Sequence, residues 1–154
     1  MNKIRILAVG KLKIPHWQQA AEEYKKRLAR MVGIEESLAR DADAGLPMPE
    51  RLAVEAERLT KLLRPSDLLI CMDERGDSFS SEGFAAFLQK LYASGKVPCF
   101  VIGGAYGLAP SVKQEAAHRI ALSAMTFTHE MARVLLLEQL YRAETILAGA
   151  GYHH

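Results

Sequence analysis

The sequence predicts an α/β fold with a mostly parallel sheet and helices on both of its faces. Three observations support this prediction. Strand-like and helix-like segments alternate five times along the 154 residues. The strand-like segments are almost wholly apolar, as in "VPCFVIGG" (97–104), which is typical of strands covered on both faces. The helix-like segments are short, as crossover connections between parallel strands usually are. The length suits one domain, expected to span residues 1–154.

Five segments are predicted to be strands because they are short, apolar and bounded by turn residues. The first, "KIRILAV", stops at Gly10, and the fourth is cut off by Gly103 and Gly104. The second, "GIEESLAR", is more polar than the others. In chain order, the expected strands are residues 3–9, 33–40, 66–73, 97–104 and 120–123.

Five further segments carry helical spacing or helix-boundary residues. Pro15 precedes the first, and Pro49 lies near the first turn of the second. Ser80 can cap the third helix and Gly95 can end it. In chain order, the expected helices are residues 16–31, 48–63, 80–95, 110–119 and 128–147.

The composition is that of an ordinary globular protein, with 49% hydrophobic and 25% charged residues. A net charge of +2 permits a nucleic-acid partner without requiring one. No apolar stretch is long enough to span a membrane, and the N-terminus is charged too early for a signal peptide, so a cytoplasmic location is expected. Cys71 and Cys99 lie in strand-like runs and are expected to be buried thiols. The histidines and cysteines lack metal-ligand spacing, so no metal site is expected.

Three common site motifs are absent: GxxxxGK[ST], GxGxxG and GxSxG. A site built from main chain and small residues remains. Ligands bind beyond the carboxyl ends of parallel strands, and loops here follow Met72, Ile102 and Leu122. Glycines after Ile102 can bring the main chain close to a flat ligand, and "LSAMTF" (122–127) is a second loop of this kind. An adenosine moiety would fit there. The residues expected to bind this cofactor are Met72, Gly103, Gly104, Leu122, Ser123, Ala124, Met125, Thr126 and Phe127.

The last expected helix, "HEMARVLLLEQLYRAETIL", is apolar on nearly every side. Such a helix is buried, and at the end of a small domain it predicts a subunit interface. Glu138 and Arg142 lie one turn apart within it. Either they form a structural ion pair or Arg142 serves the substrate. His129 and Arg133 share another face at the helix N-terminus, where a phosphate or carboxylate would be favoured.

Three motifs together resemble one known family. They are "FVIGGAYGL" (100–108), "LSAMTFTHEMARVLLLEQLYRA" (122–143) and the terminal "YHH". All three are similar to the RlmH family of SPOUT methyltransferases, also called YbeA-like. The likeness covers the full length of the chain, including the early "ILAVGK" (6–11).

The resemblance implies an enzyme that uses S-adenosylmethionine to methylate N3 of a pseudouridine in 23S ribosomal RNA, acting on the assembled ribosome. It also implies a deep trefoil knot in the C-terminal part of the α/β sheet and a homodimer packed through the last helix. From the sequence alone, Tyr152 and His153 either fray or fold back over a site. The resemblance favours a tail that borders the site. The chain departs from a relative by carrying Ala105-Tyr106 in place of Pro-Glu, and by ending in His154 in place of a stronger base.

The implied reaction requires removal of a ring N–H proton and stabilisation of the negative charge that follows. Either His129 or His153 could accept the proton, and Arg142 could stabilise the charge on a neighbouring carbonyl oxygen. The residues expected to contact substrate are Arg133, Tyr152 and His154.

Two alternatives to this function remain open. One is a methyltransferase that modifies another RNA, such as transfer RNA. The other is a ribosome-associated binding module without turnover. The basic segment "YKKRLAR" (24–30) is either a solvated helix face or a ribosome contact through Lys25, Lys26, Arg27 and Arg30.

Overall fold

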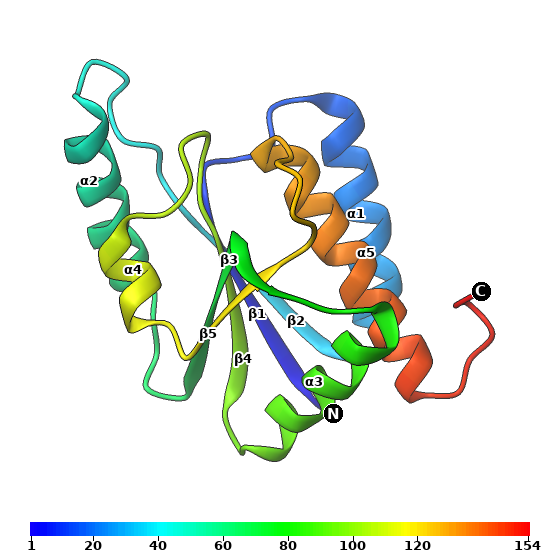
Figure 1. Cartoon of the computed structure of the whole chain (residues 1–154). Coiled ribbons are helices and arrows are strands. Elements are labelled where there is room, and N and C mark those ends of the chain that lie inside the picture. Colours follow the sequence, from blue (N-terminus) through cyan, green and yellow to red (C-terminus); the bar gives the residue numbers. More distant parts are fainter.

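The computed structural model describes all residues, 1–154, and confirms the predicted α/β fold (Figure 1). Five strands form one sheet in which every neighbouring pair is parallel. Their order across the sheet is β2-β1-β4-β3-β5. No helix is both long enough and apolar enough to cross a membrane. In chain order, the strands are β1 (Lys3–Val9), β2 (Gly33–Ala39), β3 (Asp67–Ser78), β4 (Val97–Ile102) and β5 (His118–Ala121).

Helices cover both faces of the sheet, as the apolar strands predict. The helices are α1 (Pro15–Ala29), α2 (Met48–Thr60), α3 (Ser81–Ala93), α4 (Pro110–Glu115) and α5 (His129–Leu147). Helices α1, α3 and α5 lie on one face, and α2 and α4 lie on the other (Figure 1). Each face has its own hydrophobic core. In β1, Ile4 and Ile6 belong to the core on the side of α1, α3 and α5, whereas Leu7 and Val9 belong to the core on the side of α2 and α4. Because successive side chains point to opposite faces, nearly every position must be apolar.

The predicted boundary residues act as caps. The Ser80 hydroxyl oxygen accepts a hydrogen bond from the Gly83 N–H at 3.0 Å, at the start of α3. Gly95 follows the end of α3 with φ of 77°, the left-handed region that favours glycine. Helices α1 and α2 each carry proline in the first turn, where the missing N–H costs no hydrogen bond.

The helix predicted for residues 110–119 is too long. It ends at Glu115, because His118 and Arg119 belong to β5 and pair with Ile70 and Cys71 of β3. The fifth strand accordingly begins two residues before its predicted start at position 120. Backbone pairing with a distant strand replaces the helical hydrogen bonds here.

The third strand is longer than the predicted segment 66–73, since β3 continues to Ser78. An irregularity between Met72 and Asp77 allows the end of β3 to pair with β5 again. Gly76 lies in this irregular stretch, where a Cβ atom would stand 2.5 Å from the backbone of Arg119. Only glycine permits the two strands to approach so closely.

The strand order places a ligand crevice at the carboxyl edge of the sheet. The chain proceeds outward from β1 to β2 and later fills the other side of β1 with β4, β3 and β5. Parallel sheets bind ligands near such a reversal, where the loops diverge. The trefoil knot implied by the resemblance stays a prediction.

One buried carboxyl group makes the stability of this fold depend on pH. Glu144 on α5 is 8% exposed and accepts a hydrogen bond from the Tyr92 hydroxyl on α3. Burial raises the pKa of Glu144, and the hydrogen bond from Tyr92 offsets only part of that rise. The folded chain therefore keeps this proton to a higher pH than the unfolded chain does. The free energy of unfolding must fall as pH rises between the two pKa values.

The substitution Glu144→Gln is expected to raise Tm near pH 8, because it removes the buried charge and keeps an oxygen that accepts from Tyr92. The gain over the native chain should shrink as pH falls to about 4, where the carboxyl group is protonated in both states. The difference in Tm between the variant and the native chain is measured from pH 8 to about pH 4 by thermal unfolding, with circular dichroism as the signal. Glu57→Gln, at a position 72% exposed on α2, is the control and should change Tm little at any pH. A lower Tm for Glu144→Gln near pH 8 would contradict the argument.

Candidate active site

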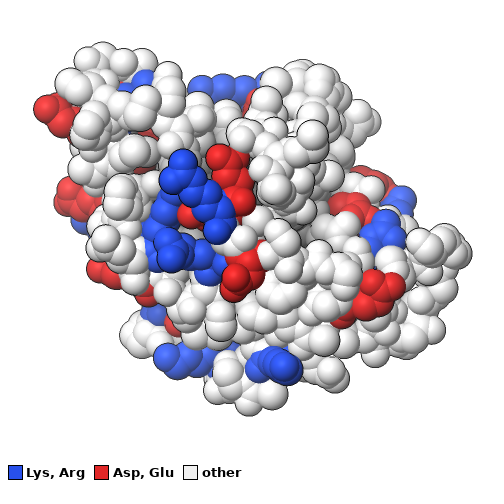
Figure 2. All heavy atoms as spheres, in the orientation of Figure 1, with Lys and Arg blue, Asp and Glu red and all other residues white.

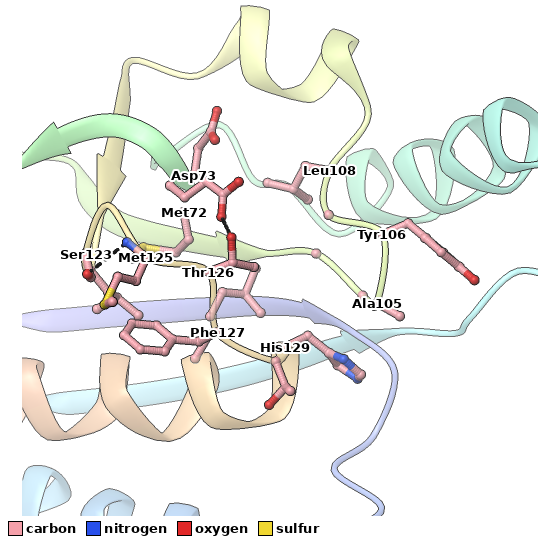
Figure 3. Close-up of a pocket in the computed structure, with 18 of the residues that line it drawn as sticks. Met72, Asp73, Ala105, Tyr106, Leu108, Ser123, Met125, Thr126, Phe127 and His129 are labelled. Atoms are coloured by element: carbon pink, nitrogen blue, oxygen red, sulfur yellow. Dashed lines mark hydrogen bonds between the residues drawn. The ribbon is translucent and has the colours of Figure 1, made fainter.

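A cavity of about 530 Å³ opens at the carboxyl edge of the sheet. Its walls come from the irregular part of β3, from the loops after β4 and β5, from α4 and from the first turn of α5 (Figure 3). The three segments singled out in the sequence, which follow Met72, Ile102 and Leu122, therefore lie together, although the first is part of β3 and not a loop. Ala124 is exposed and is not part of the wall. The other residues expected to bind a cofactor all line the cavity: Met72, Gly103, Gly104, Leu122, Ser123, Met125, Thr126 and Phe127.

The loop between β4 and α4 is a tight turn that depends on glycine. The Gly107 N–H donates to the Gly104 carbonyl at 3.0 Å, and Gly107 has φ of 80°. A Cβ atom at Gly103 would stand 2.3 Å from the backbone of Gly107. The main chain thus folds upon itself at the cavity wall, in a shape that a larger residue at position 103 would prevent.

The loop between β5 and α5 is held by side-chain hydrogen bonds. The Ser123 hydroxyl oxygen accepts from the Met125 N–H at 3.0 Å. The Thr126 hydroxyl donates to the carboxylate of Glu74, which belongs to β3. Met125 is 75% exposed, so this loop presents an apolar side chain to solvent at the cavity.

Charged groups that sequence reasoning did not assign also line the cavity. The Asp73 side chain is 7% exposed and pairs with Lys113 of α4, with Nζ and Oδ2 3.4 Å apart. Burial acts to raise the pKa of Asp73, but the hydrogen bond from the Arg75 N–H and the charge of Lys113 outweigh it and lower this pKa. Asp73 is therefore ionised at neutral pH. Its place as the last residue of the predicted third strand was the available signal.

Basic side chains gather beside these carboxylates. Lys113 and Arg119 both act electrostatically on Asp73, and Arg75 hydrogen bonds to it through the main chain. Figure 2 shows a group of basic side chains on this face, between α4 and the end of β3, with acidic side chains next to it. The opening of the cavity is thus of mixed charge.

His129 lines the cavity from the first turn of α5. Its position is fixed by neighbouring caps. Thr128 caps the helix, its hydroxyl oxygen accepting from the Met131 N–H at 3.4 Å. Glu130, which follows His129, accepts hydrogen bonds from the main-chain N–H groups of Lys13 and Ile14. Burial opposes ionisation of Glu130, but these two hydrogen bonds lower its pKa. The start of α5 is therefore tied to the start of α1.

Arg133 does not reach the cavity, and its expected anion contact does not fit the single chain. Its side chain is almost fully buried, and Nη2 donates to the carbonyl oxygens of Val9 and Gly10 at 3.2 and 2.8 Å. These carbonyls lie at the end of β1, where the chain turns away from the sheet at Gly10. Arg133 thus supplies a buried donor to backbone acceptors at the end of β1.

Arg142 and the tail lie at the other end of α5. Arg142 forms the ion pair with Glu138, with Nε and Nη2 at 3.0 and 2.5 Å from Oε1. It also lies 3.1 Å from Nδ1 of His153, whose Nε2 lies 2.8 Å from Glu82. The Tyr152 hydroxyl donates to Glu138 at 3.2 Å. The tail therefore folds back onto α5, but against its C-terminal half and away from its own cavity; the final residue, His154, is exposed.

The two cysteines take no part in the cavity. Both are free and fully buried. Burial raises the pKa of Cys71 to about 11 and that of Cys99 to about 12. Neither thiol forms a nucleophilic thiolate at neutral pH, which confirms the expectation that they are buried thiols.

The chain is similar to known proteins over its full length. A family model described as "Predicted SPOUT methyltransferase" matches residues 2–153. Two relatives carry the name "Ribosomal RNA large subunit methyltransferase H". The one from Oleidesulfovibrio alaskensis is 54% identical, with 100% of both chains covered. The one from Lawsonia intracellularis is 45% identical, with 99% of this chain and 98% of the relative covered.

Solved structures share the fold at much lower identity. A probable methyltransferase from Bordetella pertussis superimposes with a TM-score of 0.59 at 16% identity, covering 92% of this chain and 96% of that one. A probable methylase family protein from Haemophilus influenzae gives 0.56 at 17% identity, covering 98% and 70%. These two likenesses concern the arrangement of the backbone only.

Proposed function

Because the chain belongs to the SPOUT methyltransferase family, we propose that it transfers a methyl group from S-adenosylmethionine to N3 of a pseudouridine in 23S ribosomal RNA. The proposed substrate is the assembled ribosome in the cytoplasm. The observation that carries the proposal is the cavity in which a glycine-rich loop and a loop of mostly small residues meet β3 at the carboxyl edge of the sheet. The names of the full-length relatives, which refer to large-subunit ribosomal RNA, support the substrate.

The residues of the cavity suit S-adenosylmethionine. A volume of about 530 Å³ falls within the range of about 300–1,000 Å³ that small-molecule pockets span. Main-chain groups of the Gly103–Leu108 loop and of the 122–127 loop would hold the adenosine, packed against Met72 and Phe127. The carboxylates of Asp73 and Glu74 place negative charge on the wall. When bound, the cofactor supplies a positively charged sulfonium with a transferable methyl group.

The proposed role of His129 is to accept the N3 proton of the target base. It lines the cavity at the start of α5, so it borders the space where cofactor and base would meet. A histidine can accept a proton near neutral pH, and such a general base typically raises the reaction rate by roughly 10²–10⁴-fold. Arg142 is the proposed group that stabilises negative charge on a base carbonyl.

These two groups can serve one site only if a second subunit takes part. Arg142 lies thirteen residues beyond His129 along α5, a separation of about 20 Å for a helix. A two-fold axis across α5 would set the C-terminal half of one helix beside the N-terminal half of the other. Half-exposed apolar residues such as Met131 and Leu135 remain on α5 for this contact. The proposed homodimer thus completes each cavity with Arg142, Tyr152 and His153 of the partner.

In the proposed ribosome contact through segment 24–30, fewer basic side chains are free to bind RNA than the sequence suggests. Lys25 pairs with Glu22 and Glu36, and Arg27 pairs with Glu23. Lys26 and Arg30 are exposed and carry the remaining positive charge of this segment. They are the better candidates for contacts with RNA phosphates.

The decisive experiment supplies the protein with S-adenosylmethionine labelled on its methyl group and with ribosomes from a strain that lacks the modification. We expect label in the large-subunit RNA, at N3 of one pseudouridine, located by nuclease digestion and mass spectrometry. Label in transfer RNA would instead support the alternative RNA substrate. Calorimetric binding of the cofactor without any label transfer would support a binding module without turnover.

A further inference from the structure

Tyr106 is an exposed aromatic residue held at the edge of the cavity. It is 54% exposed, although it belongs to the set of residues that line the cavity. It lies in the turn closed by the hydrogen bond between Gly107 and Gly104. Figure 3 shows its ring directed outward, away from Ser123 and Phe127. The ring is therefore presented to solvent by a short, constrained turn rather than packed into the core.

A second element supports this ring. The Arg51 guanidinium of α2 lies over the Tyr106 ring, 4.9 Å from its centroid. A cation on one face of an aromatic ring is attracted to it and helps to fix its orientation. The Nε atom of Arg51 is buried without a hydrogen-bond partner. No hydrogen bond at that nitrogen therefore accounts for the position of the guanidinium over the ring. The turn and α2 together hold Tyr106 in place before any ligand arrives.

We propose that Tyr106, supported by Arg51, stacks against a nucleobase of the RNA substrate. The inference rests on the proposed function, which supplies the RNA. Proteins bind unpaired bases by stacking them on aromatic rings and guanidinium planes. A ring that is already ordered loses little conformational entropy when a base stacks on it. Because Tyr106 points outward from the cavity, its base is a neighbour of the nucleotide that enters.

Steady-state methyl transfer with ribosomes as the varied substrate tests this role. Tyr106→Ala is expected to raise KM for ribosomes about tenfold, the loss of one base stack. Tyr106→Phe should stay close to the native chain, since the ring is retained. Cofactor affinity, measured by calorimetry, should be the same in all three proteins. An unchanged KM in Tyr106→Ala would overturn the proposal. So would weaker cofactor binding with an unchanged KM, since Tyr106 would then act on the cofactor.

A crosslinking experiment separates this inference from the proposed function. p-Azidophenylalanine is placed at position 106, or at position 38 on the edge strand β2 as an exposed control. Irradiation with ribosomes should link position 106 to one region of the large-subunit RNA and leave position 38 unlinked. Such a link without methyl transfer by the native chain would refute the proposed function and keep the stacking role. Methyl transfer without a link from position 106 would refute the stacking role alone.

Discussion

Gly103→Ala is expected to weaken cofactor binding by at least about 100-fold and leave the chain folded. The added Cβ atom would stand 2.3 Å from the backbone carbonyl group of Gly107. Real atoms do not approach so closely, and the obstacle is main chain, which cannot move aside as a flexible side chain can. The turn of residues 103–107 must open, and the main-chain groups proposed to hold the adenosine move with it. A misplacement of about 1 Å can lower a reaction rate about 100-fold, and we expect a loss of similar size in cofactor affinity here.

Calorimetric titration with S-adenosylmethionine measures the loss, and thermal unfolding verifies that the variant is folded. The expected result is affinity at least about 100-fold weaker, with Tm lowered by only a few degrees. Gly45→Ala is the matched control, because its Cβ atom would make an ordinary contact with Asp43 at 3.4 Å. A Gly103→Ala variant that is folded and binds the cofactor as the native chain does would show that this loop is not the cofactor site.

The layered fold was predictable because local pattern and tertiary structure agree through most of the chain. Strand β1 needs apolar side chains on both faces, and its sequence supplies them at five of its six successive buried positions, the exception being Arg5. Ser80 and Gly95 mark the limits of α3 by capping chemistry that acts within a few residues. Features fixed by such short-range physics are visible in one sequence.

The boundaries of β3 and β5 were not predictable, because they depend on each other. Neither "ERGDS" nor "AAHR" has the composition of a strand. Their strand residues are extended because the backbones pair: His118 and Arg119 lie opposite Ile70 and Cys71. The end of β3 pairs in the same way, with Asp77 opposite Ile120 and Ser78 opposite Ala121. The close approach at Gly76 makes that pairing possible. Long-range pairing of this kind overrides local propensity.

The cavity was predictable where it consists of main chain and only in part where it consists of side chains. Paired glycines after β4 and a loop of small residues after β5 indicated the ligand site. Arg133 was assigned to the substrate because it shares a helix face with His129. A helical wheel gives the direction of a side chain but not its neighbour, and the carbonyls that Arg133 meets belong to residues 9 and 10. Lys113 was not assigned to the site, because nothing in the sequence of its helix α4 indicates that this side chain lines the cavity.

His129→Ala is expected to lower the rate of methyl transfer by about 100-fold or more, because it removes the proposed proton acceptor. Cofactor affinity should change little, since the main-chain groups of the two loops remain. His129→Gln separates the proton acceptor from a hydrogen-bonding role, because glutamine can hydrogen bond but cannot take the proton. Single-turnover methyl transfer with saturating cofactor is the measurement. A native rate in His129→Ala would remove His129 from the mechanism, and a native rate in His129→Gln would leave it only a hydrogen-bonding role.

The His129→Ala variant, combined with a variant of Arg142, tests whether Arg142 acts in the site of its own subunit or in that of the partner. Arg142→Gln should also be inactive, since it removes the proposed charge-stabilising group. If each site combines His129 of one subunit with Arg142 of the other, a mixed dimer of His129→Ala and Arg142→Gln has one site with both changes and one site with neither. Mixing the inactive proteins under conditions that exchange subunits makes half of the dimers mixed, so about a quarter of the native activity should return. If both residues served the same subunit, every site would lack one of them and no activity would return. That result would contradict the shared site, and it would require Arg142 to leave Glu138 and cross the length of α5 to reach its own cavity.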